Sequence, residues 1–135
     1  MQRWVWQGNA LIDAEGETLA RITPTGLRVG SQELSFDHTP GARRFSISGP
    51  AFSAAQAGFT VNALRAECEG REYRLERTNP FRRSRRILRD GEEVARTTPR
   101  GRDLEVAVGE LPATDAAFLS YCCLLLDGST RPLRT

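Results

Sequence analysis

Residues 116–126 contain no charged side chain over eleven consecutive positions. Thr114 or Asp115 can cap the N-terminus of a helix at this place, and Gly128 stands where a helix-ending glycine is common. At 100° per residue the side chains of such a helix point in every direction, so every face must be buried. Because the rest of the chain reads as strands, we expect the helix inside a barrel. The alternatives are a partner's groove, or a central strand of the sheet.

Most of the chain consists of short segments in which apolar and polar residues alternate, separated by Gly, Pro and Asn. Residues 104–108 show this pattern clearly, and the same alternation at residues 59–63 predicts a strand that continues toward Cys68. Residues 49–58 contain Pro50 and four alanines, which predicts a loop or a short helix. Alternation at this short spacing indicates an antiparallel all-β sheet, either closed or stacked.

Two segments of the chain repeat one another. Residues 16–26 and 91–101 are identical at seven of eleven positions, with Leu19 aligned to Val94. Each copy reads as a hairpin in which an acidic residue and Gly make the turn. Because only two copies fit, the repeat predicts two quasi-equivalent halves of one barrel, near residues 9–30 and 84–108, rather than a solenoid. Chance convergence of two hairpin turns is the alternative.

These patterns predict one domain over residues 1–135, all-β with one helix. We expect a closed antiparallel barrel around a buried apolar C-terminal helix at about 115–126, because open sheet edges aggregate. A β-sandwich ending in a strand and a lipocalin-like barrel with an external helix are the rivals. Trp4 and Trp6 share one strand face and are expected in the core. The helix residues expected to be buried together are Phe118, Leu119, Cys122, Leu125 and Leu126.

The predicted architecture resembles the C-terminal domain of tubby, whose relatives include the phospholipid scramblases and the LURP-one-related proteins. The strand-turn-strand pattern of residues 88–96 is similar to hairpins of that group, and residues 115–127 are similar to its core helix. The resemblance touches most of residues 9–128 and implies a tubby-like barrel. Tubby domains bind phosphoinositides and scramblases are linked to lipid transport, so it also implies a lipid ligand. No functional residue is carried over, because no family site matches positions of this chain.

Composition narrows the class of protein further. All 19 basic residues are Arg, and the formal net charge of +2 excludes a polycation that coats nucleic acid by charge alone. The absence of Lys excludes Schiff-base chemistry and a P-loop lysine. Cys68, Cys122 and Cys123 are odd in number and two of them are adjacent, so they do not form a disulfide framework, which favours a reducing compartment. Their spacing is not that of zinc ligands. The sequence shows neither a signal peptide nor an apolar run long enough to span a bilayer. We therefore expect a cytoplasmic protein, and a peripheral location where it contacts a membrane.

Basic charge is concentrated after the predicted turn at residues 79–81. The candidate residues for an anionic ligand are Arg82, Arg83, Arg85, Arg86 and Arg89. Neighbouring residues of a strand face opposite sides, so this segment is partly loop, or some arginines pair with acids such as Glu72 and Glu76. A basic loop beside an exposed Phe81 suits anionic lipid or other phosphate groups. Nucleic acid is an alternative ligand for the same arginines, and a solvated edge strand is the third interpretation.

The sequence offers little for catalysis. His38 is the only histidine, no Gly-x-Ser-x-Gly elbow supplies a nucleophile, and we expect His38 in an exposed loop. Cys122 and Cys123 are expected to be buried and inert. We therefore predict no catalytic, cofactor or metal site. The expected function is that of a non-catalytic binding or scaffold domain, with a nucleic-acid-binding module or a small hydrolase-type enzyme as alternatives.

Overall fold

The computed structural model describes residues 1–38, 44–79 and 81–128, which form thirteen strands and one helix. In chain order these are β1 (Gln2–Gln7), β2 (Ala10–Ile12), β3 (Thr18–Thr23), β4 (Gly26–Val29), β5 (Gln32–Ser35), β6 (Asp37–His38), β7 (Ser46–Ser48), β8 (Phe52–Gln56), β9 (Ala63–Cys68), β10 (Arg71–Arg77), β11 (Arg85–Arg89), β12 (Glu92–Arg100), β13 (Asp103–Val108) and α1 (Ala113–Asp127). All strand pairs are antiparallel and belong to one sheet.

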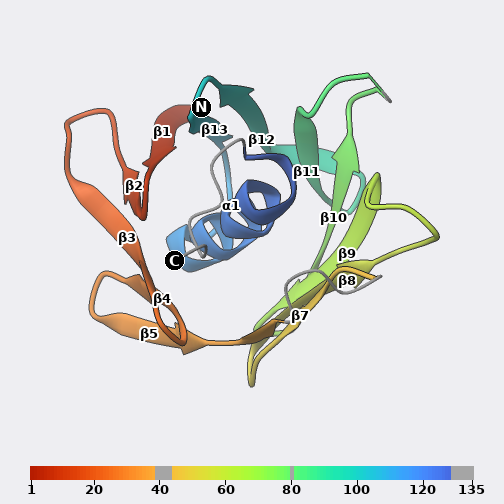
Figure 1. The fold of residues 1–135 in the computed structure, drawn as a ribbon, viewed down its shortest axis with the longest axis horizontal. Helices are drawn as coiled ribbons and strands as arrows, with labels where there is room; N and C mark the ends of the chain where they lie inside the picture. Colours follow the sequence, from red (N-terminus) through yellow and green to blue (C-terminus); the bar gives the residue numbers. More distant parts are fainter. Residues whose placement is uncertain (39–43, 80, 129–135) are drawn as a thin grey trace.

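The sheet consists of two meanders, β1 to β5 and β6 to β13, joined where β1 pairs with β13. β5 and β6 lie at opposite ends of the strand order, yet only Phe36 separates them in the chain. The sheet therefore curls round on itself into a nearly closed barrel (Figure 1). This confirms the predicted all-β barrel and excludes the sandwich.

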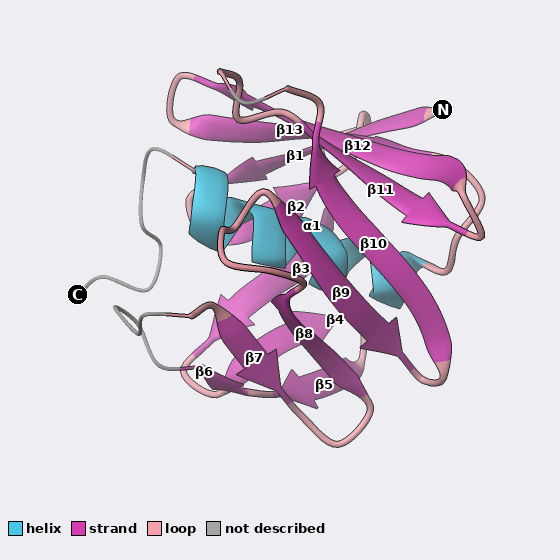
Figure 2. Cartoon of the chain, turned by 90° about the vertical axis from the view of Figure 1, so that its right-hand side faces the viewer, coloured by secondary structure: helices cyan, strands magenta, loops and turns pink. Residues whose placement is uncertain are grey.

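The helix α1 runs through the interior of the barrel (Figures 1 and 2). It begins two residues before the predicted start and ends one residue after the predicted end. Phe118, Leu119 and Cys122 have no solvent exposure, as expected, whereas Leu125 and Leu126 in the last turn are half-buried. The prediction of a helix buried on all sides is therefore confirmed for residues 115–124, whereas Ala113 at its start is exposed.

The predicted helix cap is wrong. Pro112 precedes the helix and no side chain caps its N-terminus. Asp115 instead lies in the first turn, fully buried, where Arg71 and Tyr73 bind its carboxylate. At the other end the N–H of Gly128 donates to the carbonyl of Leu124 at 3.0 Å, but Gly128 has extended rather than left-handed backbone. The Asp115 carboxylate, which suggested a cap, therefore binds Arg71 and Tyr73 in the core instead.

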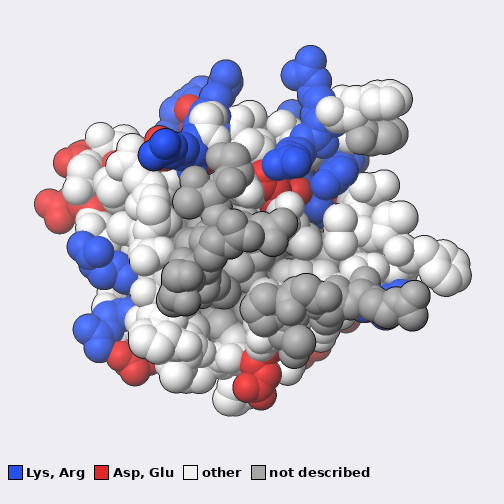
Figure 3. All heavy atoms as spheres, in the orientation of Figure 1, with Lys and Arg blue, Asp and Glu red and all other residues white. Residues whose placement is uncertain are grey.

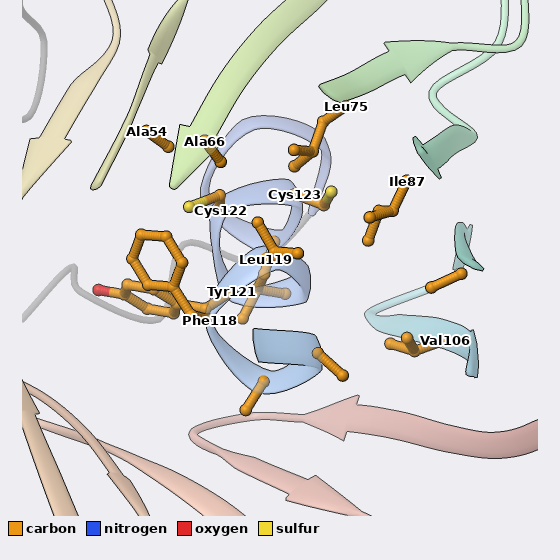
Figure 4. Close-up of a cluster of buried hydrophobic side chains, with 14 of the residues drawn as sticks. Ala54, Ala66, Leu75, Ile87, Val106, Phe118, Leu119, Tyr121, Cys122 and Cys123 are labelled. Atoms are coloured by element: carbon orange, nitrogen blue, oxygen red, sulfur yellow. The ribbon is translucent and has the colours of Figure 1, made fainter. Parts of the chain in front are cut away.

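Small residues on the inner face of the sheet make room for the helix. Ala54 and Ala66 face Phe118 and Cys122 in the core, while Leu75, Ile87 and Val106 fill the space around Leu119 and Cys123 (Figure 4). A barrel whose strands carried only large inward side chains would fill its own interior. The further buried alanines of the strands are Ala10, Ala20 and Ala95.

Two stretches of the chain differ from the prediction. Residues 49–58, expected as loop or helix, contain β8, whose inward residues Phe52 and Ala54 alternate with more exposed neighbours. Conversely, residues 57–62 form a loop, and β9 begins only at Ala63, which pairs with Glu76 of β10. Alanines of low β-propensity are tolerated in β8 because it pairs with strands on both sides.

Candidate functional site

The basic segment lies where β10 passes into β11, and we call residues 78–84 the arginine loop. The N–H of Thr78 donates to the carbonyl of Ser84 at 3.0 Å and so closes the base of the loop. The side-chain oxygen of Asn79 accepts from the N–H of Phe81 at 2.9 Å, which is an Asx-type turn. Pro80, part of the predicted turn, lies outside the described residues. The loop extends away from the barrel (Figure 1), and Phe81, Arg82 and Arg83 in it are exposed.

Arg85 does not belong to the surface, although the sequence placed it in the anionic-ligand set. Its side chain is fully buried, because Arg85 and Ile87 occupy the inward positions of β11. There its Nε donates to Oδ2 of Asp127 in α1, and its Nη2 donates to Oδ1 at 3.2 Å. A buried guanidinium needs such a partner, since an unpaired charge in the core is strongly destabilising. Arg85 therefore holds the helix rather than a ligand.

Arg86 and Arg89 are half-buried and already have partners on β10. Nη2 of Arg86 lies 3.6 Å from a carboxylate oxygen of Glu76, and the guanidinium of Arg89 lies 5.9 Å from the ring centre of Tyr73. The predicted pairing of the cluster with Glu76 thus holds for Arg86. Glu72 is exposed, and no ion pair links it to an arginine within the described residues.

Arg82 and Arg83 remain on the surface. Both are exposed, and no carboxylate in the described part of the chain forms an ion pair with either. Arg83 makes only a long hydrogen bond, 3.5 Å from its Nη1 to the backbone carbonyl of Asp127. Figure 3 shows basic atoms gathered over this loop and along the neighbouring rim near β12. These two guanidinium groups are therefore free to bind an external anion.

The residues at the base of the arginine loop also carry net positive charge. Nη2 of Arg77 lies 3.6 Å from Oδ1 of Asp127, so Arg77 and Arg85 both bind this one carboxylate, while Arg83 reaches the same residue's carbonyl. Among the described residues, Nη1 of Arg85 is buried without a hydrogen-bond partner. One carboxylate does not balance these guanidinium groups, so excess positive charge remains at this end of the helix.

Sequence reasoning missed a residue next to the arginine loop. Phe59 was expected on a strand, but it lies in the loop between β8 and β9 and is fully exposed, at 100%. Its alternation with Val61 is strand-like, yet the N–H of Ala57 already donates to the carbonyl of Ala63 and closes the loop.

The potential catalytic residues are not assembled into a site. His38 is half-buried in β6 rather than exposed, with its ring centre 5.4 Å from that of Phe45, and burial lowers its pKa. Cys68, Cys122 and Cys123 are buried as free thiols, and burial raises the pKa of Cys123 to about 12. Protonated buried thiols are poor nucleophiles.

Grooves on the outer wall of the barrel include two that are lined by described residues. One of about 620 Å³ runs over β1, β12 and β13, and one of about 230 Å³ lies over β7, β8 and β9. Neither is lined by His38 or by a cysteine, and the walls of the larger one mix arginines with acidic residues. Within the described residues, no cluster of three His, Cys, Asp or Glu side chains could hold a metal ion.

Comparison with known proteins gives no match: no family model, no curated protein and no solved structure is similar to this chain. In the part of the chain that the structure describes, α1 is the only helix, and it is too short to cross a membrane.

Proposed function

We propose that this chain is a non-catalytic binding domain of the tubby-like kind, and that the arginine loop contacts anionic phosphate groups. The observation that carries the proposal is the exposed pair Arg82 and Arg83, for which no carboxylate partner occurs among the described residues. Arginine forks match phosphate oxygens in geometry and stay charged at any physiological pH. Excess positive charge around Asp127, from Arg77 and Arg85, adds to the attraction.

The filled interior favours binding over catalysis. Phe118 and Leu119 of α1 have no exposure, and their contacts with the strands occupy the space where other barrels hold a ligand. Ligands are then left with the loops and the outer wall, which is where binding residues of rigid scaffolds usually lie. The resemblance to a family that binds phosphoinositides is compatible with this choice, and remains part of the proposal.

Vesicle co-sedimentation tests the proposal directly. We expect retention on phosphatidylcholine vesicles that contain phosphatidylserine, and none on phosphatidylcholine alone. Arg82→Ser with Arg83→Ser should weaken binding about 30-fold, from about 1 kcal/mol for each arginine near an anionic surface. The matched control is Arg3→Ser with Arg21→Ser, which removes the same charge from two exposed arginines on β1 and β3.

The outcomes separate the ligand classes. Equal loss of binding in both double variants would show that net charge, rather than the arginine loop, drives adsorption. A protein that ignores anionic vesicles but shifts DNA or RNA in a gel would assign the arginines to nucleic acid. If the protein binds neither anionic vesicles nor nucleic acid, Arg82 and Arg83 are solvated surface residues and the proposal is overturned. Native melting temperatures are expected for both variants, because these side chains are exposed.

A further inference from the structure

Two phenylalanines project from neighbouring loops of the barrel. Phe59 in the β8–β9 loop is 100% exposed, and Phe81 in the arginine loop is 95% exposed. Among the described residues, Met1 is the only other large hydrophobic side chain with comparable exposure. An isolated exposed hydrophobic residue needs no explanation, but two fully exposed aromatic tips on adjacent loops indicate a site of interaction.

The two loops leave the same end of the barrel. β9 and β10 pair from Ala63 opposite Glu76, and the N–H of Arg77 donates to the carbonyl of Asn62 at 2.9 Å. The residues that follow β10 therefore begin beside the residues that precede β9. In Figure 1 both loops extend outward on the right-hand side of the barrel.

The loops of this end carry basic residues and no acids. Residues 57–62, 78–84 and 100–102 contain no Asp or Glu, and the exposed arginines there are Arg82, Arg83, Arg100 and Arg102. The turns that alternate with them, at the other end of the same strands, are acidic. Their exposed carboxylates are Glu69, Asp90, Glu92 and Glu110. The barrel is therefore electrically polarised along its strands.

We infer that this end docks on an anionic membrane surface, with Phe59 and Phe81 inserted at the level of the headgroups and the arginines bound to phosphates around them. Aromatic residues between basic ones suit the membrane interface, where apolar rings and cationic groups are stabilised at similar depths. A free phosphate or a nucleic-acid duplex would use the arginines but give no role to Phe59. A single-stranded nucleic acid would stack bases on both rings, and the gel-shift measurement described above tests for it. The inference rests on the proposed phosphate binding and adds the membrane and the two anchors.

Tryptophan scanning locates the anchors. The native Trp4 and Trp6 are buried, so they provide a constant background of fluorescence. We expect Phe59→Trp and Phe81→Trp to shift their emission to the blue on phosphatidylserine-containing vesicles, and to be quenched by lipids with brominated chains. The matched control is Ser31→Trp in the exposed turn between β4 and β5, which should show neither change.

Removal of the rings gives the second measurement. Phe59→Ser and Phe81→Ser should each weaken vesicle binding about tenfold, which is about 1.4 kcal/mol, since a ring at the level of the headgroups is only partly removed from water. Binding of both variants to a soluble inositol polyphosphate should equal that of the unmodified chain. Normal vesicle binding with no tryptophan shift would overturn the anchors while leaving phosphate binding intact. If the unmodified chain binds neither the vesicles nor the polyphosphate, both proposals are overturned. If the unmodified chain dimerises at high concentration and the Ser variants do not, the rings belong to an interface with a second copy of this chain and the membrane anchors are overturned.

Discussion

At the scale of single residues, two buried carboxylates of α1 fasten the helix to the barrel wall. Asp115 accepts Nε of Arg71 at 2.7 Å and the hydroxyl of Tyr73 at 2.5 Å. Burial and this hydrogen bond to the carboxylate raise the pKa of Tyr73. Asp127 is bound by Arg85, which is itself fully buried. Each end of the helix thus has one carboxylate bound by arginine, which fixes its position along the barrel as well as its rotation.

Breaking the buried pair at the C-terminal end should be costly. Asp127→Asn would leave Arg85 as an uncompensated charge in the core, and we expect a loss of about 3–5 kcal/mol in the free energy of unfolding. Urea denaturation followed by circular dichroism measures it. The exposed pair Arg28 and Glu33, 2.6 Å apart, gives the matched control, because Glu33→Gln should change stability by less than about 1 kcal/mol.

The double variant Arg85→Met with Asp127→Leu removes both charges of the buried pair. It should be more stable than Asp127→Asn alone, since the fully buried guanidinium is gone and only the partly exposed Arg77 loses a partner. If Asp127→Asn costs no more than Glu33→Gln, the carboxylate does not hold the helix and this account of Asp127 is wrong.

At the scale of elements, the helix was predictable and its attachments were not. The absence of charge over residues 116–126 indicated burial on all faces, which holds for residues 116–124, while Leu125 and Leu126 are half-buried. Asp115 and Asp127 flank that run, and Asp115 was interpreted only as a candidate N-cap. The arginines that neutralise them lie on β10 and β11, and pairing between a helix and strands more than 40 positions earlier is not visible in local sequence.

The strand boundaries show the same limit. Alternation located most strands, but it assigned residues 59–62 to a strand, since Phe59 and Val61 fit a period of two. It also missed β8, whose alanines carry a weak strand signal. In the arginine cluster, alternation along β11 separates the inward Arg85 from its neighbours, but where that strand begins could not be known from the sequence.

The two similar hairpins share one irregularity. In β2–β3 the pairing register shifts so that Leu11 faces Ala20 and Ile12 faces Thr18, which leaves Leu19 as an extra residue. In β11–β12 the same shift leaves out Val94, the residue aligned with Leu19. A bulge increases the local twist and bends the strand, which helps a sheet to close. That residues 9–30 and 84–108 are quasi-equivalent halves of one barrel stays a prediction.

The burial of each helix side chain determines how much free energy of unfolding is lost when that side chain is truncated. Leu119→Ala should lower the free energy of unfolding by about 2–5 kcal/mol, because its fully buried side chain would leave a cavity. Leu125→Ala is the matched control, and it should cost less since Leu125 is half-buried in the last turn. Urea denaturation of both variants compares the costs. Equal costs would mean that the last turn is packed as tightly as the middle of the helix.

At the scale of the whole molecule, the decisive property is the separation of charge between the two ends of the barrel. The net charge is only +2, so uniform attraction to an anionic surface is weak. β12 has nine residues and spans roughly 30 Å, several times the Debye length of about 8–10 Å in physiological salt. Charges on the acidic turns are therefore screened from whatever the arginine loop touches.

This separation predicts that local charge, and not net charge, controls vesicle binding. Asp90→Asn with Glu92→Gln removes two exposed carboxylates from the β11–β12 turn and raises the net charge from +2 to +4. Asn tolerates the left-handed backbone of Asp90, whose φ is 52°, so folding should be unaffected. Affinity for phosphatidylserine-containing vesicles should stay within about twofold of the unmodified chain, because screening isolates this turn from the docked end. Removal of Arg82 and Arg83 changes the net charge by the same amount in the other direction, yet should weaken binding about 30-fold. If neutralising the acidic turn strengthens binding by a comparable factor, the barrel adsorbs through its overall charge and has no oriented docking face.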